Sequence, residues 1–335
     1  MAAFIGALGA TLVSLVFIAS FMGALHAPGP RSVPIGVVGS QAQASALSDS
    51  LGKVRSGGYT VTSYPTAQAA RGAILDRKVN AALIPAPRGE TLVVATASGS
   101  AVTNATVADV TAVARANSTP LALQNIRPLP ANDPQGISQV FFVIALLAPS
   151  LVFANLLMTR FGKAMHPVGQ LLAIAAYSLI VAAVAVVLTD PVIGALTGAP
   201  WGLFGIGTLL AFAAAVTAAA AARWARGLGY LLVFLLFIPI GIASSGTTLG
   251  PHMITEWYAD LGRALPAGSA LPAVQNTVYF NGNAITNPLL VLSAWAVAGA
   301  LALALTAVFH PPTPGSRRHQ PAPAGDSGAT ADPRS

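Results

Sequence analysis

Long apolar stretches dominate this chain and restrict what it can fold into. Most hold about 20 residues, which as a helix rising 1.5 Å per residue crosses a hydrocarbon core of roughly 30 Å. Their interiors carry no ionised side chain, and only the fifth stretch is near the lower length limit. The sequence therefore predicts an integral membrane protein, an all-α bundle of six transmembrane helices. The stretches are residues 1–27, 136–158, 168–188, 201–222, 227–243 and 288–309.

Composition supports a membrane location and excludes several classes of site. Charged residues make up 8% of the chain and apolar residues 54%, whereas a soluble domain carries about 25% charged residues. The formal net charge is +7, but the basic residues are scattered and many flank the apolar stretches. They fit a topology signal better than nucleic-acid binding. Because the chain has no cysteine, disulfides, thiolate metal sites and cysteine nucleophiles are excluded. No cofactor or metal is expected.

The first apolar stretch has two interpretations. A secretory signal has a basic start and an apolar core of about 7–15 residues. Here the apolar run is longer and no Lys or Arg precedes it, although small residues before Pro28 resemble a cleavage site. A retained first transmembrane helix is the favoured interpretation, with a cleaved signal as the alternative.

Short basic clusters predict the orientation of the bundle. With a cytoplasmic N-terminus, all of these clusters fall on the cytoplasmic side, as the positive-inside rule requires, and the C-terminus is cytoplasmic too. The flipped orientation would place all of them outside. The clusters are Arg160, Lys163 and His166; Arg223 and Arg226; and Arg317 and Arg318.

Residues 28–135 form a polar block between the first and second apolar stretches. Strand-like runs alternate with helical patterns, and Thr66 is a suitable N-cap for a helix with an apolar stripe at Ala69, Ala70, Ala73 and Ile74. Alternating strands and helices predict a small α/β domain, here extracytoplasmic and inserted between spans one and two. No acid pair, histidine cluster or nucleophile–base pattern occurs in it, so a packing or recognition module is expected.

The segment 244–287 is rich in Gly, Ser, Pro and Asn, yet it contains several aromatic residues. Met253, Trp257 and Leu261 have helical spacing, which predicts a short amphipathic helix at the headgroup level. Pro239 and Gly241 weaken the preceding helix, and non-helical backbone at membrane depth must lie against protein or a water-filled cavity. A re-entrant segment is one interpretation, and an ordinary external loop with aromatic anchors is the other.

His252, Glu256 and Asp260 are spaced so that a helix would align them. Their pattern matches no recognised metal-binding motif, and a solvated helical face is the expected explanation.

Several stretches carry a resemblance to a known family. They are ARGAILDRKVNAALIPAP at 70–87, DPQG at 133–136, and IPIGIASSGTTLGP at 238–251 with LPAGSALPAVQNTVYFNGN at 265–283. Together with the arrangement of one span, a large external domain and five spans, they resemble the permeases of type-2 ABC exporters, in the branch of the YhgE/Pip-like proteins.

The resemblance implies an exporter of the bacterial plasma membrane. Two permease subunits, as a homodimer or a pair, would work with two separate ABC ATPase subunits to move an apolar or amphipathic substrate outward. The chain has no G-x-x-x-x-G-K-[ST] loop, so ATP would be bound by the partner.

The resemblance also implies two functional regions. The expected ATPase contact is Arg160, Phe161, Lys163 and His166. The expected re-entrant or translocation region comprises Pro239, Gly241, Ser244, Ser245, Gly246, Trp257, Tyr279 and Phe280.

Two departures from the family favour a second hypothesis. Little sequence precedes the first span, and the loop at 159–167 is short for a helix that engages an ATPase. The alternative is a non-transporting surface protein whose external domain binds an envelope component or partner. An enzyme is not expected, because no ionisable residue lies within the spans. The tail at 311–335, rich in Pro, Gly and Ala, is expected to be disordered.

Overall fold

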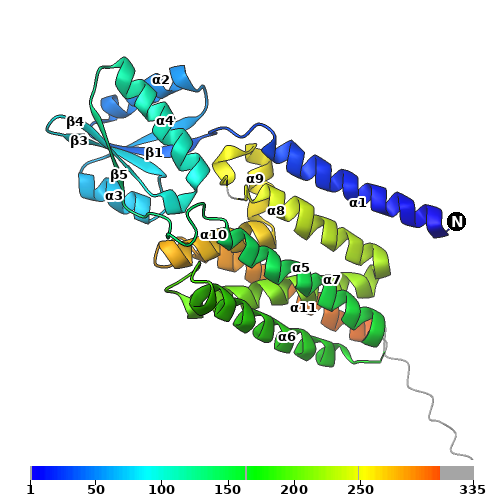
Figure 1. Cartoon of the computed structure of the whole chain (residues 1–335). Helices are drawn as coiled ribbons and strands as arrows, with labels where there is room; N and C mark the ends of the chain where they lie inside the picture. The colour runs from blue at the N-terminus through cyan, green and yellow to red at the C-terminus, as the bar shows by residue number, and fades with distance from the viewer. Residues whose placement is uncertain (1, 163, 248, 310–335) are drawn as a thin grey trace, which may run out of the picture.

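The computed structural model describes residues 2–162, 164–247 and 249–309. An α/β domain lies at one end of an elongated molecule, and a helical bundle extends away from it (Figure 1). The N-terminus lies at the end of the bundle farthest from the domain. We call the end that carries the α/β domain the domain end. Lys163 and the predicted tail, 311–335, lie outside the described residues.

The α/β domain has the alternation of strands and helices that its sequence predicts. One five-stranded sheet has the order β2-β1-β3-β4-β5. The β3–β4 pair is antiparallel and the other neighbours are parallel. The elements are β1 (Val33–Val38), α2 (Gln41–Val54), β2 (Tyr59–Tyr64), α3 (Ala67–Leu75), β3 (Ala81–Ala86), β4 (Gly89–Val94), the 3₁₀ turn η1 (Thr96–Ser98), α4 (Ser100–Ala116) and β5 (Leu121–Asn125).

Helices cover both faces of this sheet. On one face, buried residues of α2 and α4, such as Leu51 and Val110, pack against Ile35 of β1. On the other face, α3 packs against β3, and Ile74 of α3 and Ile84 of β3 belong to the same buried cluster. Alternate strand residues supply the two faces, as expected for a side-chain period of two.

A partly buried ionic cluster in this domain predicts acid sensitivity. Asp109 of α4 accepts hydrogen bonds from Arg55 Nε (2.8 Å) and from the Tyr59 hydroxyl (2.6 Å). Burial alone would raise the pKa of Asp109, but these hydrogen bonds and the Arg55 charge outweigh it and lower the pKa. Because the pKa of Asp109 is lower in the folded state than in the unfolded chain, where it is about 3.9, the ionised carboxylate stabilises the fold at pH values above about 3.9. That stabilisation is lost as the pH falls through the folded-state pKa.

We expect Asp109→Asn to lower the free energy of unfolding at pH 7 by about 1–2 kcal/mol, since the Arg55 side chain is 42% exposed and partly screened. The difference from the wild type should shrink below about pH 4. Thermal unfolding in detergent, followed by circular dichroism from pH 7 to pH 3, measures this. Asp49→Asn, at an exposed position, is the control. A constant difference across this pH range would contradict the assignment.

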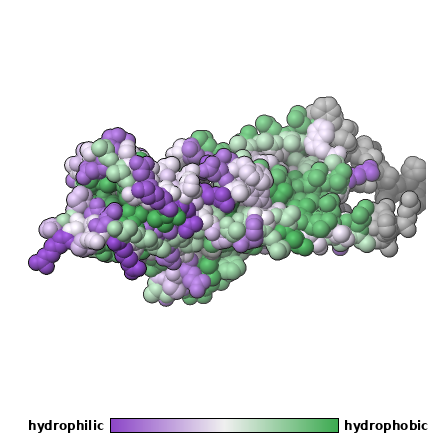
Figure 2. Space-filling model, turned by 90° about the horizontal axis from the view of Figure 1, so that it is seen from above, coloured by the Kyte–Doolittle hydropathy of each residue, from purple (hydrophilic) through white to green (hydrophobic). Residues whose placement is uncertain are grey.

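Five helices are long and apolar enough to cross a membrane, among the described residues. Large apolar side chains on them face outward, and Figure 2 shows an apolar surface over the bundle beside a more hydrophilic α/β domain. This confirms a mostly helical chain compatible with a membrane, together with an α/β sheet domain. The helices include α1 (Ala2–Leu25), α5 (Ser138–Phe161), α6 (Pro167–Val187), α7 (Pro200–Leu235) and α11 (Thr286–Phe309).

The structure has five such helices where the sequence predicts six spans, because residues of the predicted fourth and fifth spans join in one segment, Pro200–Ser244. It contains α7, the π-helical turn η3 (Leu236–Ile240) and α8 (Gly241–Ser244). The segment is broken between the two predicted spans, where Ala225 and Arg226 have non-helical backbone angles. The ribbon reverses its direction at this break (Figure 1).

Basic residues gather at the end of the bundle opposite the α/β domain, which we call the basic end. The Arg223 guanidinium donates a hydrogen bond to the carbonyl oxygen of Gly162. Trp224 Nε1 donates to the carbonyl of Ala302, 3.0 Å away. The α5–α6 turn, the break in α7 and the later part of α11 therefore lie together.

Short helices follow the broken segment. They are the 3₁₀ turn η4 (Pro251–Met253), α9 (Glu256–Arg263) and α10 (Pro266–Tyr279); a π-helical turn, η2 (Leu188–Val192), ends α6. Helix α10 is buried along most of its length and contacts α5, α7 and α11. Its 14 residues extend only about 21 Å, which is less than a bilayer core.

Asp133 caps the start of α5. Its buried carboxylate accepts hydrogen bonds from the backbone nitrogens of Ile137 and Ser138, both at 3.0 Å. These donors have no partner within the helix, so the carboxylate satisfies them.

We expect Asp133→Ala to lower the free energy of unfolding by about 1–2 kcal/mol, because two backbone donors lose their acceptor. Asp133→Asn keeps one side-chain carbonyl and should lose less. Thermal unfolding of the purified variants measures both. An alanine variant as stable as the wild type would show that water replaces the cap.

Candidate functional site

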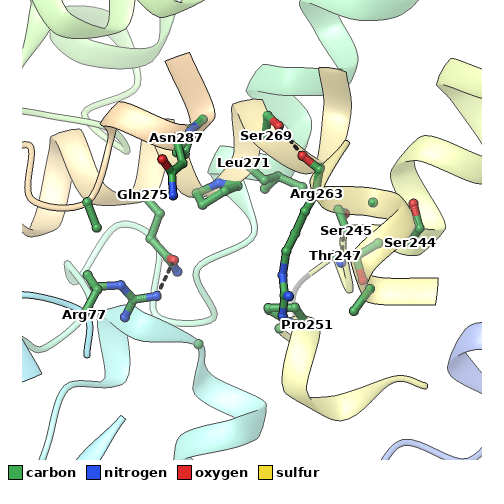
Figure 3. A pocket seen from close by; sticks show the side chains of 18 of the residues that line it. Arg77, Ser244, Ser245, Thr247, Pro251, Arg263, Ser269, Leu271, Gln275 and Asn287 are labelled. Atoms are coloured by element: carbon green, nitrogen blue, oxygen red, sulfur yellow. Dashed lines mark hydrogen bonds between the residues drawn. The ribbon is translucent and has the colours of Figure 1, made fainter. Parts of the chain in front are cut away.

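A cavity of about 450 Å³ lies where the α/β domain meets the bundle (Figure 3). Its walls come from the α3–β3 turn, the start of α4, the start of α5, the α8–α9 segment, α10 and the start of α11. The lining includes Arg77, Ser98, Gly99, Gln139, Ser244, Ser245, Thr247, Arg263, Ser269, Leu271, Pro272, Gln275, Asn287, Pro288 and Val291. Of the described residues that line it, none is Asp or Glu.

Arg77 is the cationic residue that the α/β domain contributes. It follows the end of α3 with a left-handed backbone conformation (φ 63°). Nη2 donates a hydrogen bond to Gln275 Oε1 of α10 at 3.1 Å, and the guanidinium lies 4.6 Å from the centre of the Phe280 ring. Burial lowers the pKa of Arg77 to about 10, so the group remains positively charged at neutral pH. No carboxylate among the described residues forms an ion pair with it.

Arg263 is the cationic residue that the bundle side contributes. It ends α9, and its Nη1 lies 2.5 Å from Asp260 Oδ1, with both side chains largely exposed. Its carbonyl oxygen accepts a hydrogen bond from Ser269 Oγ at 3.0 Å, which fixes the turn between α9 and α10. In Figure 3 the side chains of Arg77 and Arg263 lie on opposite sides of the cavity.

The charges of both arginines affect the pKa of His252, which lies in η4. Burial lowers the pKa of His252, and the charges of Arg263 and Arg77 lower it further, against an opposing hydrogen bond with the Arg31 backbone and the charge of Glu256.

Two buried polar side chains of the lining have unsatisfied atoms. Ser98 Oγ and Gln139 Oε1 are buried without a hydrogen-bond partner among the described residues. Ser98 immediately precedes Gly99, the N-cap of the 17-residue helix α4, and no side chain caps that helix. Buried polar atoms are normally satisfied, so each of these two lining residues has one unused hydrogen-bonding atom.

Close backbone contacts shape the floor of the cavity. A Cβ atom at Gly262 would overlap the carbonyl oxygen of Ser244, and one at Gly268 would overlap the carbonyl oxygen of Gly262. Helices α8, α9 and α10 thus approach one another through glycine. Gly246 makes the preceding turn with φ +75°, which favours glycine.

The predicted translocation residues are distributed over several places. Ser244 and Ser245 line the cavity, Pro239 and Gly241 are buried in the segment before it, and Gly246 makes the turn described above. Tyr279 and Phe280 end α10, where Phe280 packs into the core of the α/β domain. Trp257 is 70% exposed and is not among the cavity residues.

The predicted amphipathic helix forms as α9, which carries Trp257 and Leu261 one turn apart, but its extension to Met253 is wrong. Ile254 and Thr255 are extended and separate η4 from α9, so the three residues do not share one helix. Met253 is buried against Val33 and Val102, whereas Trp257 faces outward.

The same break separates His252, in η4, from Glu256 and Asp260, which both lie in α9, so the three residues that the spacing would have aligned do not share one helix. Glu256 accepts a hydrogen bond from Ser32 Oγ at 2.6 Å, and Asp260 pairs with Arg263. No group of three potential metal ligands is found in the described part of the chain.

The predicted ATPase contact lies at the basic end. Arg160, Phe161 and His166 are exposed, and Lys163 is outside the described residues. His166 also caps α6, since its Nδ1 accepts a hydrogen bond from Val168 N at 3.3 Å.

Sequence analysis missed the role of Arg77, Ser98, Gln139 and Gln275. Gln139 and Gln275 carry a usable signal, because an amide in an otherwise apolar helix needs a partner. Arg77 carries none, because an arginine after a surface helix is ordinary and only the folded chain brings it to α10.

No protein-family model and no curated protein matches this chain. The function proposed below is therefore argued from the geometry and from the resemblance described above.

Proposed function

We propose that this chain is a permease-like subunit of an ABC-type exporter in a bacterial plasma membrane, moving an apolar or amphipathic substrate outward with a separate ATPase. The observation that carries the proposal is the cavity between the α/β domain and the short, buried helix α10. It combines an apolar wall with converging polar groups, which is typical of small-molecule sites.

Six spans fit the contacts better than five. A straight helix of 45 residues would extend roughly 68 Å, about twice a bilayer core. Both flanks of the segment lie at the domain end: Gly194 accepts a hydrogen bond from Asn132, and Met253 accepts one from Gly29 N. A hairpin that turns at Ala225 and Arg226 satisfies both constraints. The chain then has six spans, with the α/β domain between the first and the second.

The charge distribution favours an external α/β domain. The exposed arginines of the basic end, Arg160 and Arg226, flank apolar helices, and the positive-inside rule therefore favours a cytoplasmic location for that end. Both termini are then cytoplasmic, and the cavity faces outward.

Helix α10 acts as a re-entrant element in this proposal. Trp295 Nε1 donates a hydrogen bond to the carbonyl of Ala264 at 2.8 Å, and Trp295 lies about 13 Å along α11 from its first residue. Helix α10 therefore begins at a level well inside the length of α11, and the chain leaves α10 at Phe280, which packs in the core of the α/β domain. Backbone of this kind is tolerated in a membrane only when protein or a cavity surrounds it.

The exporter would pair two permease subunits, as a homodimer, with two ATPase subunits at the basic end. Purification of the tagged protein from its native membrane in mild detergent, with mass spectrometry, tests this. We expect a stoichiometric Walker-type ATPase, and we expect Arg160→Glu combined with His166→Glu to remove it. Arg88→Glu, a charge reversal at an exposed position of the α/β domain, should retain the ATPase.

One observation favours the non-transporting surface protein as a second candidate. The described residues between α5 and α6 form no helix, and the carbonyl of Gly162 is bonded to Arg223 and to Gln170 of the same chain. This turn presents little to an ATPase. A clean homo-oligomer in the purification would support this candidate and contradict the exporter.

A further inference from the structure

We infer that the cavity binds the phosphate group of an amphiphile, with the apolar part of the ligand against α10 and α11. The role of this ligand as the transported substrate rests on the proposed function, whereas its binding does not.

The charge of the lining selects an anion. Arg77 and Arg263 face the cavity from two sides, and none of the described lining residues is acidic. Arg263 is partly neutralised by Asp260, but Arg77 is half-buried with a neutral partner, Gln275. A guanidinium that is partly withdrawn from water without a counter-ion is disfavoured, and a bound oxyanion would supply the missing charge.

Hydrogen-bond donors converge on the same space. Gly99, the N-cap of α4, lines the cavity, so the positive end of the α4 helix dipole lies at its wall, a position that favours an anion. The Ser98 hydroxyl, buried without a partner, can donate beside it. Gln139 presents an amide whose nitrogen can donate after a half-turn of the side chain.

The remaining wall requires more than a free ion. Leu271, Pro272, Pro288 and Val291 make one side of the cavity apolar. Its volume of about 450 Å³ is in the range of roughly 300–1,000 Å³ that holds small organic ligands. A lone phosphate would leave this apolar side exposed to water, whereas an acyl or isoprenoid chain would cover it.

Isothermal titration calorimetry of the full chain in an uncharged maltoside detergent tests the inference. The probes are dioctanoyl phosphatidic acid, inorganic phosphate and dioctanoylglycerol, which has the same chains without the phosphate. We expect the phosphatidic acid to bind most tightly, and Arg77→Gln to weaken it about tenfold or more, since a charged hydrogen-bonded pair is lost.

Further variants keep the test decisive if Arg77→Gln does not fold. Arg263→Gln, at a largely exposed side chain, and Ser98→Ala should each weaken binding about three- to tenfold. Arg88→Gln, on the far side of the α/β domain from this cavity, should leave binding unchanged.

Three results would overturn the inference. Equal binding of dioctanoylglycerol, or binding that none of the three substitutions weakens, would exclude a phosphate site. Inorganic phosphate binding as tightly as the lipid would keep the oxyanion site but overturn its assignment to an amphiphile. Phosphatidic acid binding by a protein that purifies without an ATPase would leave this inference standing while the exporter proposal failed.

Discussion

Replacing Phe280 with alanine is expected to lower the free energy of unfolding by about 3–5 kcal/mol, the cost of emptying a large buried aromatic site. Phe280 is 1% exposed and follows α10, yet it packs among Ala70, Ala73 and Ile74 of α3. The substitution would also remove the ring beneath the Arg77 guanidinium. The α/β domain should then be held to the bundle less firmly.

Thermal unfolding in detergent measures the loss, and limited proteolysis of the native protein should cut more readily between the domain and the bundle. Phe141→Ala is the matched control, because Phe141 of α5 is 61% exposed and its truncation should change stability by less than about 1 kcal/mol. Equal losses from the two substitutions would contradict the docking role of Phe280.

Gly268→Val should be the second severe substitution. Its Cβ would overlap the carbonyl oxygen of Gly262, which is backbone and cannot rotate away. Helices α9 and α10 would have to separate, and overpacking of this kind costs about 3 kcal/mol or more. The floor of the cavity would shift with them, so loss of phosphatidic acid binding should accompany the lower unfolding temperature.

Gly205→Val is the control for this substitution. Gly205 lies in α7 and has no atom within 4 Å of an ideal Cβ, so the variant should fold and bind the lipid like the wild type. A Gly268→Val protein with wild-type stability would show that α9 and α10 are not tightly packed in solution.

The α/β domain could be predicted because its signals are local. Strand periodicity, the Thr66 cap and the apolar stripe of α3 each depend on a few neighbouring residues, and Thr66 Oγ1 accepts a hydrogen bond from Ala69 N at 3.1 Å. The apolar helices could be predicted for a similar reason, since length and composition identify them. The order of the strands depends on long-range pairing, and no short pattern encodes it.

The cavity could not be predicted because its parts come from distant segments. Arg77 and Gln275 are separated by most of the chain, and Ser98 and Gln139 meet them only after the α/β domain docks on α10. The stripe at Met253 failed for a different reason. Helical spacing does not reveal that Met253 packs against β1 and α4, or that Ile254 and Thr255 after it are extended.

The central claim is a six-span chain with the α/β domain and the cavity outside and the basic end inside. Because the chain has no cysteine, single cysteines at exposed positions can be labelled in cells with a membrane-impermeant maleimide. Ser56→Cys and Thr197→Cys mark the domain end, and Ala164→Cys and Ala225→Cys mark the basic end.

We predict that the cysteines at 56 and 197 react in intact cells and that those at 164 and 225 react only after permeabilisation. Labelling of the cysteine at 225 from the same side as that at 56, or protection of both even after permeabilisation, would contradict the hairpin at Arg226 and with it the six-span arrangement.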